Sequence, residues 1–249
     1  LGGSYLDLTD GRNRINVLEP RMWSAEDKEP DPEAPAAFQS GSVLSQHIAF
    51  LRDFFRSYKP FTEAEIDTIE IMLGRLYDSR GLRDDTDYSR LSPRDYPILS
   101  DLYDQMDAEY QRVRTGSGGE LYTPELLRSA CLGLHSMCKG ADAKFFNGHT
   151  NIHDTRLITF GVKDLMEGGK NIKDAMLFNV LSYINHALIA GGNTAGIFEE
   201  LHVFLSNPVA VSYIRSAMKR VRKRDSLIGL ASQNIEDFLL PGVAEMTKP

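Results

Sequence analysis

Short apolar runs alternate with helical patterns through the C-terminal half of the sequence, and this alternation restricts the fold more than any other feature. The apolar runs lie at 157–161, 195–199 and 227–231. Residues with the three-to-four spacing of a helix follow each run, at 172–189, 207–224 and 235–239. Strands that alternate with helices form parallel sheets whose two faces are covered by the helices. We therefore predict an α/β core built on one parallel sheet.

A different pattern fills residues 42–140, where helical spacing continues without strand signals. Thr62 with Glu65 has the pattern of a capping box, and Thr123-Pro124-Glu125 is a strong helix start. Residues 4–8 alternate like a strand, whereas residues 24–39 carry three prolines and predict a flexible loop. We expect residues 1–41 to form the start of the core and this loop, 42–140 an inserted helical subdomain, and 141–249 the rest of the core.

Composition and charge exclude several classes of protein. The net charge of the 249-residue chain is −7, so any contact with DNA has to be local. No apolar run approaches the roughly 18 residues that span a bilayer, which predicts no integral membrane segment. The sequence begins at Leu1 without an initiator Met or a signal peptide, and we expect it to be cut from a longer protein.

Polar side chains follow two of the predicted strands at the points where these strands end. Glu199 and Glu200 follow one strand, and Gln233 follows the next. Ligands collect at the carboxyl ends of parallel strands, where one carboxylate can hold Mg²⁺ and a second can activate a water that attacks a γ-phosphate. A glutamine beside them can bond that phosphate or the water. The alternative is that the acids only begin a helix and the amide only begins a turn.

The basic run from Lys219 to Arg224 has three interpretations. One or two of its arginines can serve as arginine fingers that reach the nucleotide of a neighbouring subunit. The run can instead contact a DNA backbone. It can also simply complement the dipole at the end of a helix.

Two further groups contain metal-ligand side chains, and for both we favour a structural interpretation. Cys131, His135 and Cys138 share one predicted helix face, but a closed zinc site needs a fourth ligand. The two thiols would lie about 10 Å apart, too far for a disulfide, and a reducing cytoplasmic compartment is the simple interpretation. His149 and His153 lie in a stretch without helical spacing, which predicts a turn into the strand at 157–161.

No glycine-rich loop ending in Gly-Lys-Ser or Gly-Lys-Thr occurs in the sequence. Such a loop cradles the phosphates of a nucleotide with its backbone amides and its lysine. We expect the loop to lie upstream of Leu1. The isolated chain should then neither bind ATP tightly nor hydrolyse it.

The order of these motifs resembles the ATPase domain of the VirB/TraC class of conjugal transfer and type IV secretion motors, in particular the conjugal transfer ATPases of integrative elements in Gram-positive bacteria. The segments that carry the resemblance are 1–3 with 13–18, 97–103, 146–151, 197–205, 222–224 and 231–238. They cover most of the chain, and their order is more specific than any one of them.

The resemblance implies a RecA-like P-loop NTPase core with an inserted all-helical subdomain, and ATP with Mg²⁺ as cofactors. It also implies a hexamer that works with the other subunits of the transfer machine, in the cytoplasm at the inner face of the bacterial membrane. By the same resemblance, Glu199 falls on the acid that holds the nucleotide-bound Mg²⁺ and Glu200 on the catalytic glutamate. Gln233 falls on the glutamine that senses the γ-phosphate, and Arg222 or Arg224 on the arginine finger. The family usually has Asp before Glu, so the extra methylene of Glu199 moves the first carboxylate.

The function expected from these residues is part of an ATP-hydrolysing motor subunit for conjugative transfer of DNA or protein. One alternative is a DNA-translocating ATPase of the coupling-protein type, in which the Lys219–Arg224 run follows the DNA. The other is a docking module of the transfer machinery without catalysis.

Overall fold

The computed structural model describes residues 2–24, 31–39, 41–117, 121–153, 155–162, 169–205, 207–239 and 243. The chain divides into two compact units. Unit 1 comprises residues 1–20 and 54–176, and unit 2 comprises residues 21–53 and 177–249. The predicted domain boundaries at 41/42 and 140/141 stay predictions.

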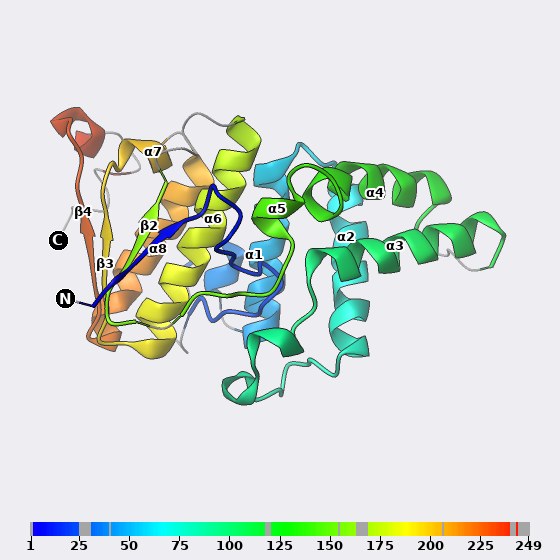
Figure 1. Cartoon of the computed structure of the whole chain (residues 1–249), viewed down its shortest axis with the longest axis horizontal. Helices are drawn as coiled ribbons and strands as arrows, with labels where there is room; N and C mark the ends of the chain where they lie inside the picture. Colours follow the sequence, from blue (N-terminus) through cyan, green and yellow to red (C-terminus); the bar gives the residue numbers. More distant parts are fainter. Residues whose placement is uncertain are drawn as a thin grey trace. The chain divides into compact units, whose positions relative to one another are not determined.

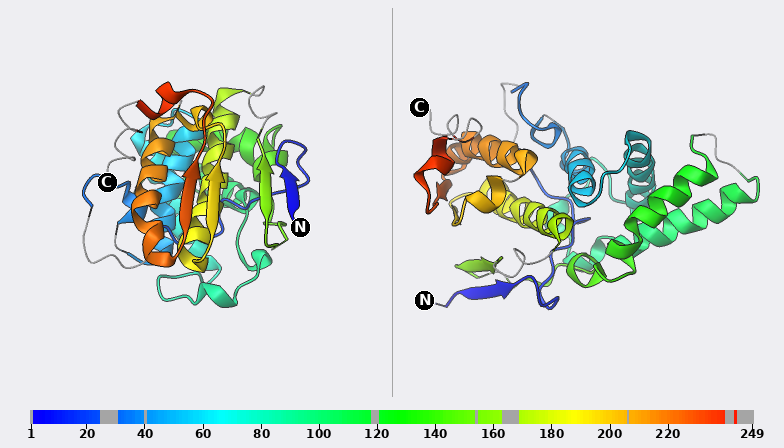
Figure 2. Two further views of the ribbon diagram at one scale, coloured as in Figure 1. Left: turned by 90° about the vertical axis from the view of Figure 1, so that its left-hand side faces the viewer. Right: turned by 90° about the horizontal axis from the view of Figure 1, so that it is seen from above.

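Four short strands form two separate parallel pairs (Figure 2). In unit 1, β1 (Ser4–Asp7) pairs with β2 (Ile158–Gly161). In unit 2, β3 (Ala195–Phe198) pairs with β4 (Leu227–Leu230). The prediction of parallel strands is confirmed, but the prediction of one sheet is wrong for the described residues. The reason is that β2 pairs with a strand more than 150 positions earlier in the sequence, and no local pattern encodes so distant a pairing.

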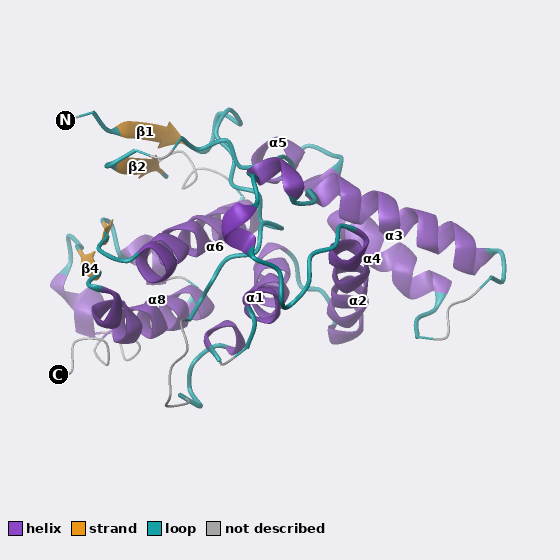
Figure 3. Ribbon diagram, turned by 90° about the horizontal axis from the view of Figure 1, so that it is seen from below, coloured by secondary structure: helices purple, strands orange, loops and turns teal. Residues whose placement is uncertain are grey.

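Helices dominate unit 1 (Figures 1 and 3). Thr62 begins α2 (Glu63–Ser79) with the predicted capping box, since its side chain accepts from the Glu65 amide and Glu65 reaches back. Thr123 begins α4 (Pro124–Cys138) as predicted, and α3 (Leu99–Arg114) lies alongside α4. A short α5 (Ala143–Phe146) follows, and α1 (Val43–Tyr58) enters the unit with its last turn. The 3₁₀ turns Tyr88–Arg90 and Pro93–Asp95 connect α2 to α3.

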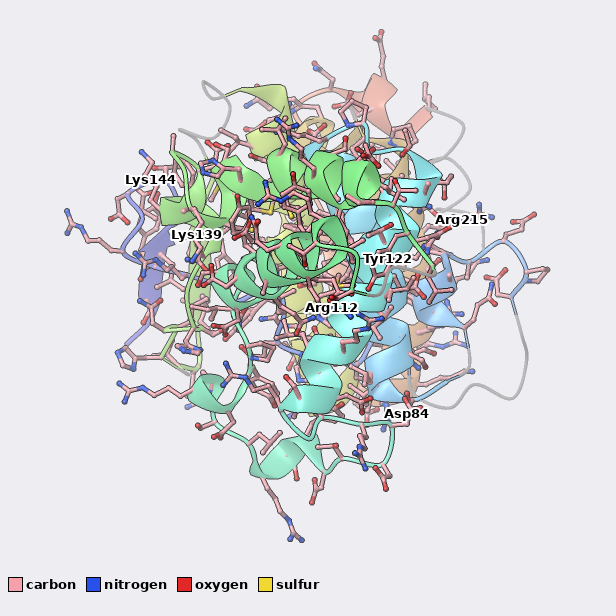
Figure 4. The ribbon with its side chains drawn as sticks, turned by 90° about the vertical axis from the view of Figure 1, so that its right-hand side faces the viewer. Asp84, Arg112, Tyr122, Lys139, Lys144 and Arg215 are labelled. Carbon is pink, nitrogen blue, oxygen red and sulfur yellow. The ribbon has the colours of Figure 1, made fainter. Side chains whose placement is uncertain are left out.

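A cluster of polar and charged side chains around Glu109 on α3 ties these helices together. Figure 4 labels two of its members, Arg112 and Tyr122. The Glu109 carboxylate accepts from Arg112, from Arg75 on α2 and from the hydroxyl of Tyr122. These bonds, that of Arg112 first, lower the pKa of Glu109 to about 2. The cluster thereby joins α2, α3 and the residues that precede α4.

Unit 2 packs its helices on one face of the β3–β4 pair. It contains most of α6 (Lys170–His186), a π-helical turn (Ala187–Gly191), α7 (His202–Leu205), α8 (Pro208–Val221) and the 3₁₀ turns Arg222–Arg224 and Ile235–Leu239. Leu188, Ile189 and Val221 form a buried cluster against Ile228 of β4. On the other face, Ile197 is 61% exposed and Leu227 54% exposed. The prediction that helices cover both faces is therefore wrong for this pair.

The core of unit 2 is aromatic. The ring of Trp23 lies 4.8 Å from that of Phe50 and 4.9 Å from that of Tyr213, and Phe178 lies 4.7 Å from Tyr213. Phe38, at the end of the 3₁₀ turn Ala36–Phe38, packs 5.4 Å from Trp23. Part of the predicted loop at 24–39 is thus packed into the core, while its residues 25–30 lie outside the described residues.

No helix in the described part of the chain combines the length and the apolar character that crossing a membrane requires.

Candidate functional site

The ends of β3 and β4 bring two of the predicted site residues, Glu200 and Gln233, to one place. The pairing is in register, with Phe198 opposite Leu230, so both strands end at the same level. The amide of Ala231 donates to the Phe198 carbonyl (2.9 Å), and the amide of Leu201 donates to the Ala231 carbonyl (3.0 Å). These two bonds fix the turn after β3 against the turn after β4.

Glu200 and Gln233 meet directly across this junction. Gln233 Nε2 donates to Glu200 Oε1 at 2.6 Å. Glu200 takes a φ of 53°, in the left-handed region that a long side chain rarely occupies. Such strained positions gather at functional sites. The Glu200–Gln233 contact is the most specific feature of the site.

Leu201 and Phe204 explain why the chain accepts this strain. Leu201 is 1% exposed, and the Phe204 ring packs edge-on against Phe198 at 5.5 Å. Burying these side chains requires a sharp reversal directly after β3. The same reversal leaves Glu199 exposed and brings His202 back towards Glu200.

The second oxygen of Glu200 faces His202. Glu200 Oε2 lies 3.3 Å from His202 Nδ1, within ion-pair distance. The same oxygen atom is buried and makes no hydrogen bond to a described residue. Sequence reasoning missed His202, because a histidine two positions after a carboxylate has no distinctive spacing.

Two side chains of the basic run, Lys219 and Arg220, contact other residues of unit 2, whereas Arg222 and Arg224 extend to the surface. Lys219 pairs with Asp31 at 2.8 Å, and the pKa of Asp31 is lowered by that bond. Arg220 is buried, with its guanidinium 5.2 Å from the Phe38 ring centre. Arg222 and Arg224 are exposed and have no carboxylate partner among the described residues.

Arg222 and Arg224 also lie at the wrong end of β4 to reach Gln233. Both precede Leu227, where β4 begins, whereas Gln233 follows Leu230, where β4 ends. The four residues of the strand extend about 13 Å. Within one chain the structure therefore separates the two arginines from the Glu200–Gln233 contact.

Comparison with known proteins identifies a structural relative. No family model matches the sequence, and no curated protein matches it. The solved structure of VirB4 of Thermoanaerobacter pseudethanolicus matches 98% of this chain with a TM-score of 0.78 and 27% sequence identity.

The chain is similar in structure to this VirB4.

The predicted resemblance is thus confirmed, and so is the mixed α/β class. The VirB4-like chain spans 60% of the length of that relative.

Glu199 is the only predicted metal residue, and its surroundings limit what it can hold. No group of three or more His, Cys, Asp or Glu side chains within the described ranges could bind a metal ion. Mg²⁺ commonly keeps several waters and takes one or two carboxylates together with the phosphates of a nucleotide. Exposed Glu199 of the VirB4-like chain fits that role only with a nucleotide present.

Packing accounts for the cysteines on α4. Burial raises the pKa of Cys131 to about 11 and that of Cys138 to about 12, so both are protonated thiols at neutral pH. The two cysteines are free rather than disulfide-bonded. His135 is occupied by an edge-on contact with Tyr103 at 5.7 Å.

The polar side chains at 147–151 are used in hydrogen bonds that hold this stretch against other segments of unit 1. Asn147 accepts from the Ser100 amide at the start of α3, and Thr150 accepts from the Asn16 amide. Asn151 accepts from the Arg14 amide and donates to the Arg12 carbonyl. These bonds hold residues 12–16 within unit 1. Asp154, at the end of the predicted turn, lies outside the described residues.

Proposed function

We propose that this VirB4-like chain carries the acid and amide side of an ATP-hydrolysing site in a motor subunit of a type IV secretion or conjugative transfer machine. The Glu200–Gln233 bond of 2.6 Å at the ends of two parallel strands supports the proposal most directly. In open α/β sheets ligands bind at that end of the strands. The proposal takes the core to be RecA-like and the nucleotide to be ATP with Mg²⁺.

Each residue then has a separate role. Exposed Glu199 holds the Mg²⁺ that neutralises the phosphates, and Glu200 orients and activates the attacking water. Gln233 Nε2 donates one hydrogen to Glu200 and has a second for the γ-phosphate, while the amide oxygen of Gln233 accepts from the attacking water. The phosphate-binding loop is absent from this sequence and has to come from elsewhere in the protein.

Arg222 and Arg224 act on a neighbouring subunit in this proposal. Their exposure and their distance from Gln233 along β4 favour a finger that acts in trans. Such an arginine changes turnover by about 10³–10⁵ in other NTPases. This role requires an oligomer, and we propose a homohexamer at the cytoplasmic face of the membrane.

The DNA-tracking alternative has less support. Lys219 and Arg220 are engaged within unit 2, so the basic run offers fewer free cations to a phosphate backbone.

Steady-state ATP hydrolysis by the full-length protein that contains this chain tests the proposal. We expect Glu200→Gln to lower kcat by about 10²-fold or more while nucleotide binding is kept, because the water loses its base. Glu236→Gln is the matched control, since this exposed acid lies on the neighbouring turn outside the contact. Full activity of the Glu200→Gln protein would refute the proposal.

A further inference from the structure

One oxygen of the Glu200 carboxylate, Oε2, is buried without a hydrogen-bond donor among the described residues. The other oxygen, Oε1, is bonded to Gln233. A carboxylate oxygen that leaves water without a donor is costly, and native structures rarely keep one. A donor for Oε2 is therefore expected nearby.

His202 is placed to be that donor. Its Nδ1 atom lies 3.3 Å from Oε2, so a small rotation of the imidazole completes a bond. The main chain maintains this proximity, because the Val203 amide donates to the Glu200 carbonyl (2.9 Å) and the Leu201 amide donates to the carbonyl of Ala231, directly after β4. The other titratable side chains on these turns are Glu199, which is exposed, and Glu236 and Asp237. Asp237 accepts from the Ser232 hydroxyl instead.

We propose that His202 is a positioning residue, which donates from Nδ1 to Oε2 of Glu200 and so holds the carboxylate between two donors. With Gln233 on one oxygen and His202 on the other, the carboxylate cannot rotate, and its remaining lone pairs have a fixed direction. A base held in this way is oriented before the water arrives. The inference rests on the proposed function for its catalytic meaning, whereas the contact itself exists without nucleotide.

The contact determines which ring nitrogen of His202 carries the proton. A neutral imidazole has one N–H, and the hydrogen bond that it makes selects the nitrogen. Long-range ¹H–¹⁵N spectra of the isotope-labelled chain, recorded without nucleotide at a pH where His202 is neutral, report this directly. We expect the proton on Nδ1 in the wild-type chain. We expect Glu200→Ala to lose that preference and Glu199→Ala, the matched control, to keep it.

A proton on Nε2 in the wild-type chain would overturn the inference, and this result does not depend on whether any variant folds. Retention of the Nδ1 proton in Glu200→Ala would overturn it equally, because something other than Glu200 would then select the nitrogen.

Kinetics of the full-length protein test the positioning role. We expect His202→Ala to lower kcat about tenfold with little change in KM, because orientation rather than binding is lost. His202→Asn places an amide nitrogen near the position of Nδ1 and should restore most of kcat. Equal kcat for the wild type and His202→Ala would show that His202 does not position Glu200.

Absence of ATP hydrolysis in the wild-type full-length protein would sink the proposed function instead. The tautomer measurement would then still decide whether the Glu200–His202 contact exists.

Discussion

His186 at the end of α6 is a partly buried histidine whose protonation is disfavoured by the fold. Its Nδ1 accepts from the Met22 amide at 3.0 Å, a bond that only the unprotonated nitrogen can make. Burial, together with the positive charge of Arg21, lowers the pKa of His186 to about 4. An unfolded chain protonates the same side chain near pH 6.5.

The pKa of His186 predicts a loss of stability in mild acid. The pKa of His186 is lower in the folded chain than in the unfolded chain. The neutral ring therefore contributes fully to the free energy of unfolding above about pH 6.5, and this contribution is lost as the pH falls towards 4. We expect the free energy of unfolding to drop by up to about 3 kcal/mol over this window on account of His186.

Urea unfolding at pH 7 and pH 4.5 checks this prediction by comparing the wild type with His186→Gln. The glutamine oxygen can still accept from the Met22 amide but does not titrate in this range. The variant should therefore lose about 2 kcal/mol less than the wild type between the two values. Identical losses would contradict the prediction, since all other groups titrate alike in both proteins.

At the scale of single elements, two glycines in helix interiors face different surroundings within unit 1. A Cβ on Gly133 of α4 would lie 2.2 Å from the ring of Phe61, whereas a Cβ on Gly74 of α2 would meet nothing within 4 Å. The absent side chain of Gly133 thus lets the turn before α2 approach α4 closely. At Gly74 no neighbouring atom requires the side chain to be absent.

Alanine at these two positions should change stability in opposite directions. Gly133→Ala forces the Phe61 ring to move and should lower the free energy of unfolding by about 1–3 kcal/mol. Gly74→Ala gains helix propensity and should raise it by about 0.5–1 kcal/mol. Thermal or urea unfolding measures both. A stabilising Gly133→Ala would show that Phe61 does not pack on α4 as described.

At the scale of the whole molecule, the separation of the arginines from the Glu200–Gln233 contact makes the oligomer part of the proposed mechanism. An active site built from two subunits needs Arg222 or Arg224 from one copy and Glu200 from the next. Variants that damage opposite sides of such a site can complement each other in a mixed oligomer.

Mixing full-length Arg222→Ala/Arg224→Ala protein with full-length Glu200→Gln protein tests this arrangement. Each variant alone should lose most of its ATP hydrolysis, because an arginine finger or a base is missing from every site. The mixture should recover part of the activity, since some interfaces combine two intact halves. Lack of recovery in a proven mixed oligomer would place all these residues in one subunit's own site.

The chain taken alone should bind nucleotide poorly. It contains no Gly-Lys-Ser or Gly-Lys-Thr loop, so nothing in it supplies the amides and the lysine that hold the β- and γ-phosphates. Isothermal titration calorimetry with MgATP should detect no micromolar binding. A micromolar dissociation constant would mean that another part of the chain cradles the phosphates.

The sequence alone determined the local elements and the order of the polar residues at the ends of the strands. Thr62, Thr123 and Asn207 begin their helices through bonds to nearby backbone amides, and Glu200 and Gln233 follow strands of equal length. Such features depend on neighbours in the sequence, which is why spacing and residue type predict them.

Only the tertiary structure decided the long-range arrangement. It paired β2 with β1 and left one face of β3 and β4 exposed, and it engaged Lys219 with Asp31 and buried Arg220. It also turned the chain at Glu200 so that His202 faces the carboxylate. These outcomes depend on which distant surfaces bury each other, and that balance of packing and desolvation is not encoded in any local pattern.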